Sequence, residues 1–201
     1  DSGTGGDVVM MGGTSSLSSG GQIYLSGGTS SAATGGRIYI QSGFSSGHSS
    51  GVIGIQTANA GAAGVSGYLS LSTGVSLDGN SGAIFVGSGA SSSGRGGLMS
   101  VTVGSGDSGA GGDLVLTAGG SSHTVVAGVG GQVYMSAGTS GSHTGGRILI
   151  RSGVSSASTS GALGIVTADS DAAGVSGYIV LSSGVSSFGN GGALFVVSGV
   201  S

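Results

Sequence analysis

Residues 21–35 read GQIYLSGGTSSAATG, and residues 36–50 read GRIYIQSGFSSGHSS. Each stretch opens on a glycine, carries large apolar residues two and four positions later, reaches another glycine seven positions later, and then becomes rich in serine. We call the opening glycine the marker of its repeat. The chain has thirteen such markers, separated by 15 residues except for two spacings of 16 and one of 19. The markers are Gly6, Gly21, Gly36, Gly51, Gly67, Gly82, Gly97, Gly112, Gly131, Gly146, Gly161, Gly177 and Gly192.

Two positions of the repeat are apolar in every copy. The first apolar column lies two residues after the marker and includes Ile23, Ile38 and Ile53. The second apolar column lies four residues after the marker and includes Leu25 and Ile40. Apolar residues at a step of two lie on one face of an extended chain, so the pattern predicts a short strand in each repeat. Gly density and this period exclude helices.

Such a strand is too short to bury its apolar face alone, and stacking of successive repeats would bury it. We therefore predict an all-β fold, a single-stranded β-solenoid of thirteen coils of about 15 residues, continuous over residues 1–201 and without helices. The glycine seven positions after the marker predicts a tight turn, and the serine-rich stretch predicts a second short strand. Over its whole length the chain resembles Gly/Ser-rich tandem-repeat solenoid proteins at the level of architecture.

A longer duplication lies over the short repeat. Residues 20–89 match residues 130–199 at an offset of 110, and residues 1–7 match residues 107–113 at an offset of 106. The halves 1–106 and 107–201 are thus two copies of one block. The difference in offset predicts an insertion near residues 123–129, which we interpret as a bulge or loop leaving the column.

Composition excludes several classes of protein. The 201 residues include 50 Gly and no Pro, Cys or Trp, and the formal charge is −3. So little positive charge predicts no nucleic-acid binding, and no apolar run approaches the ~18 residues of a membrane span. The mean hydropathy of +0.41 argues against disorder. Abundant Ser, Thr and Gly are typical of an extracellular or cell-surface material.

The register of the two ends predicts self-assembly. If residue 1 followed residue 201, the spacing from Gly192 to Gly6 would again be 15 residues. A contact that joins one end to the other without closing produces an open filament. We therefore expect a non-enzymatic structural protein, either a segment of a longer solenoid or a subunit that stacks head to tail into a fibre or filament with itself as its partner. Binding to ice, or to a polysaccharide as an adhesin, is the alternative.

Outward positions suggest a lateral contact surface. The position three residues after the marker, which we call the intervening column, should face away from the core. Aromatic residues there predict lateral packing against another rod, or stacking on sugar rings. This aromatic stripe comprises Tyr24, Tyr39, Phe85, Tyr134 and Phe195.

The residue directly after the marker forms a polar ladder in two places. Side chains stacked in this way are expected to hydrogen-bond along the column, which would be a structural role. The ladder comprises Asp7, Gln22 and Arg37, and again Asp113, Gln132 and Arg147.

The position eight residues after the marker carries hydroxyl and methyl groups, and in residue type it is similar to the flat arrays of ice-binding solenoids. Phe44, Asn59, Gly120 and Asp169 interrupt it, which puts ice binding in doubt. The array comprises Thr14, Thr29, Val75, Thr139, Val154 and Val185.

No residue pattern predicts catalysis, a cofactor or a metal. His48, His123 and His143 lie in predicted turns, and only the last two could approach each other. Zinc needs three or four ligands and calcium needs six or more oxygens, which Asp169 and Asp171 do not supply. We therefore expect no active site.

Overall fold

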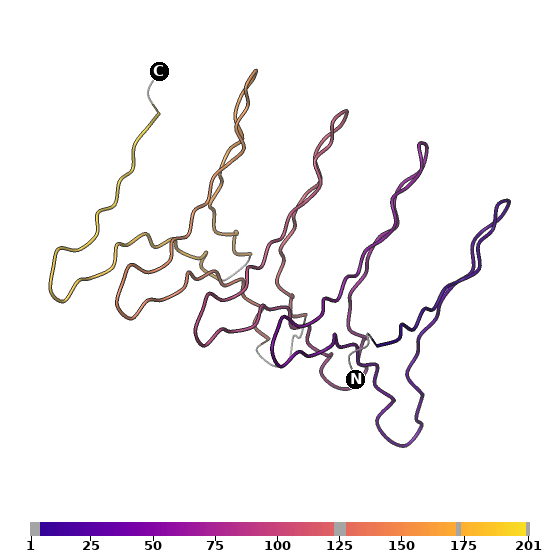
Figure 1. The fold of residues 1–201 in the computed structure, drawn as a ribbon. Coiled ribbons are helices and arrows are strands. Elements are labelled where there is room, and N and C mark those ends of the chain that lie inside the picture. Colours follow the sequence, from indigo (N-terminus) through magenta and orange to yellow (C-terminus); the bar gives the residue numbers. More distant parts are fainter. Residues whose placement is uncertain (1–4, 123–127, 172–173, 200–201) are drawn as a thin grey trace. The chain divides into compact units, whose positions relative to one another are not determined.

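A computed structural model describes residues 5–122, 128–171 and 174–199, and these form neither helices nor strands. The chain is extended between the places where it bends, and among the described residues most repeats contain one bend. The chain divides into two units, residues 1–100 and 101–201, each of which is described by itself. In both units the chain runs outward and returns alongside itself in narrow loops (Figure 1).

The predicted β-solenoid is wrong for the described residues, because they contain no sheet into which coils could stack. A sheet needs successive backbone hydrogen bonds along neighbouring strands. Here one backbone bond closes a reversal, as between Gly21 N and Gly13 O at 2.7 Å, and no ladder continues from it along the two legs. The period of two is present in the sequence, but the bonds form within a reversal instead of between stacked coils.

The serine-rich stretches are also not second strands. They contain the bends at which the chain turns back, for example over residues 16–18, 31–33 and 46–48. We call the segment from the glycine seven residues after one marker to the next marker the reversing loop. In seven of these loops a backbone hydrogen bond joins the two ends, so these repeats consist of one extended leg followed by one closed loop.

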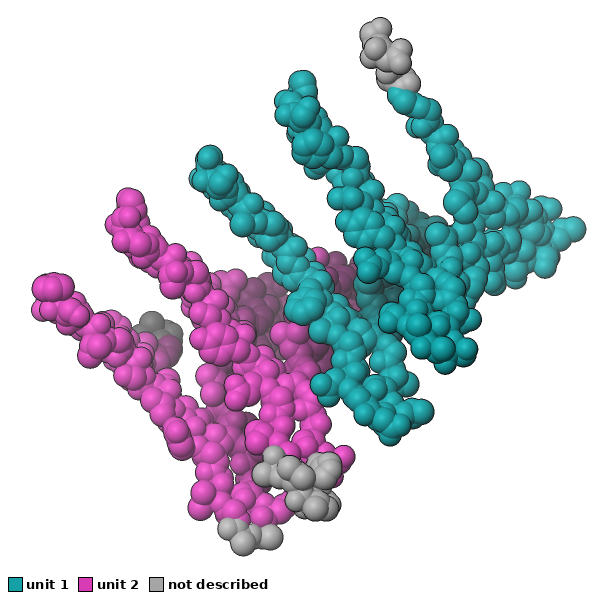
Figure 2. Space-filling view, turned by 90° about the horizontal axis from the view of Figure 1, so that it is seen from below, with its two compact units in different colours: residues 1–100 teal, residues 101–201 magenta. Residues whose placement is uncertain are grey.

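No described residue is buried, so the predicted interior rows of aliphatic side chains are absent as well. Ile23, Ile38 and Ile53 each keep about half of their surface exposed. The space-filling view shows why: narrow projections of the chain, one loop thick, extend from both units (Figure 2). A loop of this width has no second layer that could cover an apolar face.

No helix among the described residues is both long enough and apolar enough to cross a membrane. The predicted bulge near residues 123–129 falls mostly outside the described residues, and so does His123.

Candidate functional site

Seven of the reversing loops are closed by a hydrogen bond between their two ends. The marker N–H donates to the carbonyl oxygen of the glycine at the start of the loop, usually eight residues earlier. The donor–acceptor distances, 2.7 to 3.2 Å, are those of ordinary backbone hydrogen bonds. The bonds run from the N–H of Gly21, Gly36, Gly51, Gly112, Gly131, Gly146 and Gly161 to the carbonyl oxygen of Gly13, Gly28, Gly43, Gly104, Gly119, Gly138 and Gly153, respectively.

A serine inside the loop fixes the bend. Its Oγ accepts a hydrogen bond from the backbone N–H three residues later, at 2.9 or 3.0 Å. This is the local side-chain-to-backbone bond by which serine favours turns. The serine always lies nine residues after the marker, which explains its recurrence in the sequence. The acceptors are Ser15, Ser30, Ser45, Ser76, Ser91, Ser140 and Ser155.

The closest packing lies where the two legs meet, not along the apolar columns. The residue six positions after one marker contacts the next marker glycine across the loop. A Cβ placed on Gly97 would lie 2.9 Å from Ser88 Cβ, and one on Gly112 would lie 2.7 Å from Val103 Cγ1. Such distances are shorter than real Cβ contacts, so a larger residue at Gly97 or Gly112 would displace the opposite leg. A close approach therefore favours glycine at the markers Gly21, Gly36, Gly97 and Gly112, whereas a Cβ on Gly67 would meet only an ordinary contact at 3.6 Å.

In two loops for which no backbone closing bond is found, a hydroxyl group at this sixth position bonds across the loop instead. Thr73 Oγ1 donates to Gly82 O at 3.2 Å, and Ser88 Oγ donates to Gly97 O at 2.9 Å. Most of the described residues that are half-buried rather than exposed are small residues at this position. These residues are Gly12, Gly27, Ser42, Ala118, Ala137 and Ser152.

The glycine seven residues after the marker has a different environment from the one predicted. A Cβ on Gly13, Gly28 or Gly43 would meet nothing within 4 Å, and none of the three has a φ in the left-handed region. Neither crowding nor a left-handed backbone therefore demands glycine there. Sequence analysis assigned the turn to this residue, whereas the adjacent small residue and the marker carry the steric constraint.

The apolar columns keep a difference in exposure despite the absence of a core. Ile23 and Ile53 are each 48% exposed, whereas Tyr24 and Phe85, in the intervening column, are 88% and 95% exposed. Apart from Val8, which is exposed, the first apolar column therefore forms a half-covered row, and the aromatic stripe is more exposed than this column. Tyr24, Tyr39 and Phe85 belong to the first unit, and Tyr134 and Phe195 to the second.

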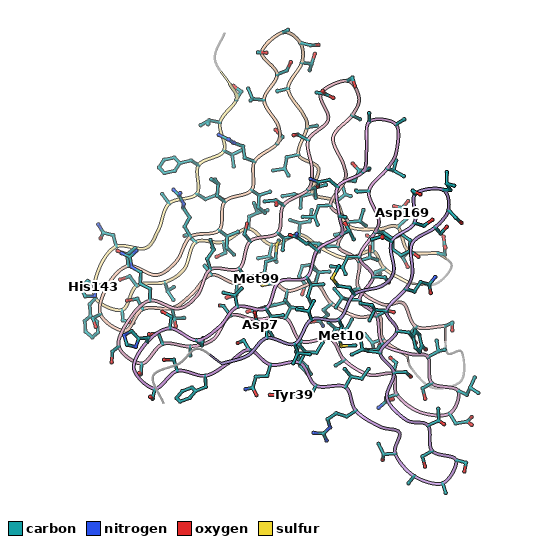
Figure 3. The ribbon with its side chains drawn as sticks, turned by 45° about the vertical axis from the view of Figure 1, so that its right-hand side comes forward. Asp7, Met10, Tyr39, Met99, His143 and Asp169 are labelled. Atoms are coloured by element: carbon teal, nitrogen blue, oxygen red, sulfur yellow. The ribbon has the colours of Figure 1, made fainter. Side chains whose placement is uncertain are left out.

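The polar ladder residues are exposed, and the hydrogen bonds found among the described residues join none of them to one another. Figure 3 labels Asp7, the first member, on the first leg of the chain. In the other ladder positions the preceding marker is held by its loop bond, as at Gly21 before Gln22 and Gly36 before Arg37. The backbone that presents these side chains is therefore fixed locally.

The predicted hydroxyl and methyl array lies at the start of the reversing loops. Thr14 follows directly after Gly13, the acceptor of the loop bond, and Val75 and Val185 are almost fully exposed. Because the described residues include no strand, these side chains do not share the flat face of a sheet.

Acidic and histidine side chains are scattered. Within the second unit, His143 and Asp169 lie far apart in Figure 3. Residues 5–122, 128–171 and 174–199 include no group of three or more His, Cys, Asp or Glu that could hold a metal ion.

Sequence analysis missed the two positions that organise the loop. The signal was available: the ninth position after the marker is serine in most repeats, and the sixth is Gly, Ala, Ser, Thr or Val throughout. Neither position was predicted, because the interpretation relied on the large apolar residues.

No family model, curated protein or solved structure matches the chain.

Proposed function

We propose that the chain is a non-enzymatic, extracellular structural protein that associates with further copies of itself into a fibre or filament. The observation that supports the proposal is the exposure of the apolar columns. Every large apolar side chain that the structure describes keeps at least 43% of its surface exposed. A chain of mean hydropathy +0.41 in that state has a strong tendency to cover this surface.

The magnitude is sufficient for association. Full burial of one large aliphatic side chain contributes about 1.5–3 kcal/mol, so a half-exposed column residue retains about 1 kcal/mol that a partner could supply. Because the columns recur in all repeats, a few repeats in contact would outweigh the cost of association, about 4–15 kcal/mol.

A second copy of this chain is the partner favoured by the sequence. The same columns recur every 15 or so residues, so one copy matches another at many places. The chain has no Pro, and its net charge of −3 over 201 residues supplies little repulsion. Proline and charged residues are the usual means by which exposed extended segments avoid association.

Sedimentation of the purified chain across a wide range of concentration tests the proposal, together with electron micrographs of the same samples. We expect the weight-average mass to rise with concentration and elongated particles to form. A monomer at every concentration would refute the proposal. Thermal hysteresis and binding to insoluble polysaccharide, measured on the same preparation, would instead support ice binding or adhesion.

A further inference from the structure

The polar ladder offers a means by which two copies could select their relative direction. Its two occurrences have the same order along the chain, Asp then Gln then Arg, at corresponding positions of consecutive repeats. We call each occurrence a triplet. The triplets are Asp7, Gln22 and Arg37, and Asp113, Gln132 and Arg147.

The side chains of both triplets are accessible to another chain. All six residues are exposed, and each directly follows a marker glycine. For five of the six, from Gln22 to Arg147, that glycine donates the hydrogen bond that closes a loop. Neighbouring members are therefore held at equivalent points of successive loops, while their charged ends are free to meet another chain.

The order of the residues is self-complementary in one direction only. If two triplets meet with opposite directions, Asp7 faces Arg37, Gln22 faces Gln22 and Arg37 faces Asp7. If they meet in the same direction, Asp faces Asp and Arg faces Arg. Opposite charges across a contact attract and like charges repel, so the second arrangement is disfavoured twice in each triplet.

We propose that the triplets set an antiparallel register between two copies of this chain when the apolar columns associate. The inference rests on the proposed self-association and adds its direction. Glutamine suits the centre, because its amide both donates and accepts hydrogen bonds and so can pair with a second glutamine across a two-fold axis.

Two variants of identical composition and net charge test the order of the triplet. The reversed variant exchanges the end residues in both triplets: Asp7→Arg, Arg37→Asp, Asp113→Arg and Arg147→Asp. The scrambled variant exchanges the first two: Asp7→Gln, Gln22→Asp, Asp113→Gln and Gln132→Asp. In an antiparallel contact the reversed triplet still places Arg opposite Asp, whereas the scrambled triplet places Asp opposite Asp.

Sedimentation equilibrium gives the association constant of each protein. We expect the reversed variant to associate as the original chain does and the scrambled variant to associate about tenfold more weakly, since several exposed charge pairs are altered together. At about 1 M salt, where the screening length is about 3 Å, the difference should vanish. If the association constant of the scrambled variant recovers in 1 M salt, its apolar columns are still able to associate.

Equal association of all three proteins at low salt would overturn the register and leave self-association standing. Weak association of the reversed variant together with the scrambled one would also overturn it, because order would then not matter. A monomeric original chain would refute the proposed function and the inference that rests on it.

Discussion

The substitution Gly27→Ala tests whether the close approach of the two legs determines the loop. A Cβ on Gly27 would press against the carbonyl oxygen of Gly36 and lie 2.9 Å from its carbonyl carbon. Both atoms belong to the backbone, so no side-chain rotation relieves the contact. The neighbouring change Gly28→Ala is the matched control, because a Cβ there meets nothing within 4 Å.

The magnitude follows from these contacts. Inserting a methyl group where it does not fit costs about 1–3 kcal/mol, and at about 1.4 kcal/mol per factor of ten this is roughly a 5- to 150-fold change in the loop-closing equilibrium. Gly28→Ala should leave the loop unchanged or stabilise it by about 0.4–1 kcal/mol, because alanine reduces the freedom of the open chain.

Hydrogen exchange of the Gly36 amide, followed by NMR, reports on this loop, since that N–H donates to Gly28 O at 2.7 Å. We expect Gly27→Ala to accelerate exchange at Gly36 and to leave the next loop, reported by the Gly51 amide, unaffected. Unchanged exchange in Gly27→Ala, or equal acceleration in Gly28→Ala, would refute the steric explanation.

Three further changes probe the loop bonds and the apolar columns. Ser45→Ala removes the acceptor of the 3.0 Å bond from the His48 N–H and should destabilise that loop by about 0.5–1.5 kcal/mol; Gly51 exchange should rise, while Ser46→Ala should have little effect. Thr73→Val keeps the shape of the side chain but removes the 3.2 Å hydrogen bond to Gly82 O. We expect a chemical-shift change at Gly82 and its neighbour Ala83. Unchanged shifts would mean that the Thr73 hydroxyl does not hold this loop. Ile38→Ser should weaken self-association, measured by sedimentation, about fivefold through loss of about 1 kcal/mol of apolar burial. Leu77→Ser is the control, because Leu77 lies in a loop and is 97% exposed, and it should not weaken association. Equal effects of the two changes would show that the apolar columns are not the contact surface.

The sequence was sufficient to locate the repeat, but it did not show which segments of the chain form hydrogen bonds with one another. Marker glycines such as Gly21 and Gly36 recur at the loop ends, and Ile23 remains more covered than Tyr24, but the predicted burial of the apolar columns was wrong for the described residues. What periodicity of two does not specify is the partner of an extended segment. Loop closure between Gly13 and Gly21 brings together residues close in sequence, whereas stacked coils would require many longer-range pairings at once.

The serine-rich stretches show the same difficulty at shorter range. Thr14, Ser15 and Ser16 read as a strand if β-propensity alone is considered. The hydroxyl of Ser15 instead accepts a bond from the Ser18 N–H and bends the chain. The fixed recurrence of serine, and not its propensity, was the informative feature.

The central claim is that the apolar columns remain uncovered within one chain and become covered by association. Fluorescence of an environment-sensitive apolar dye, recorded beside sedimentation while the protein is diluted, measures both quantities together. We expect strong dye binding per chain at low concentration, falling as the mass of the particles rises. A monomer that binds no dye at any concentration would contradict it.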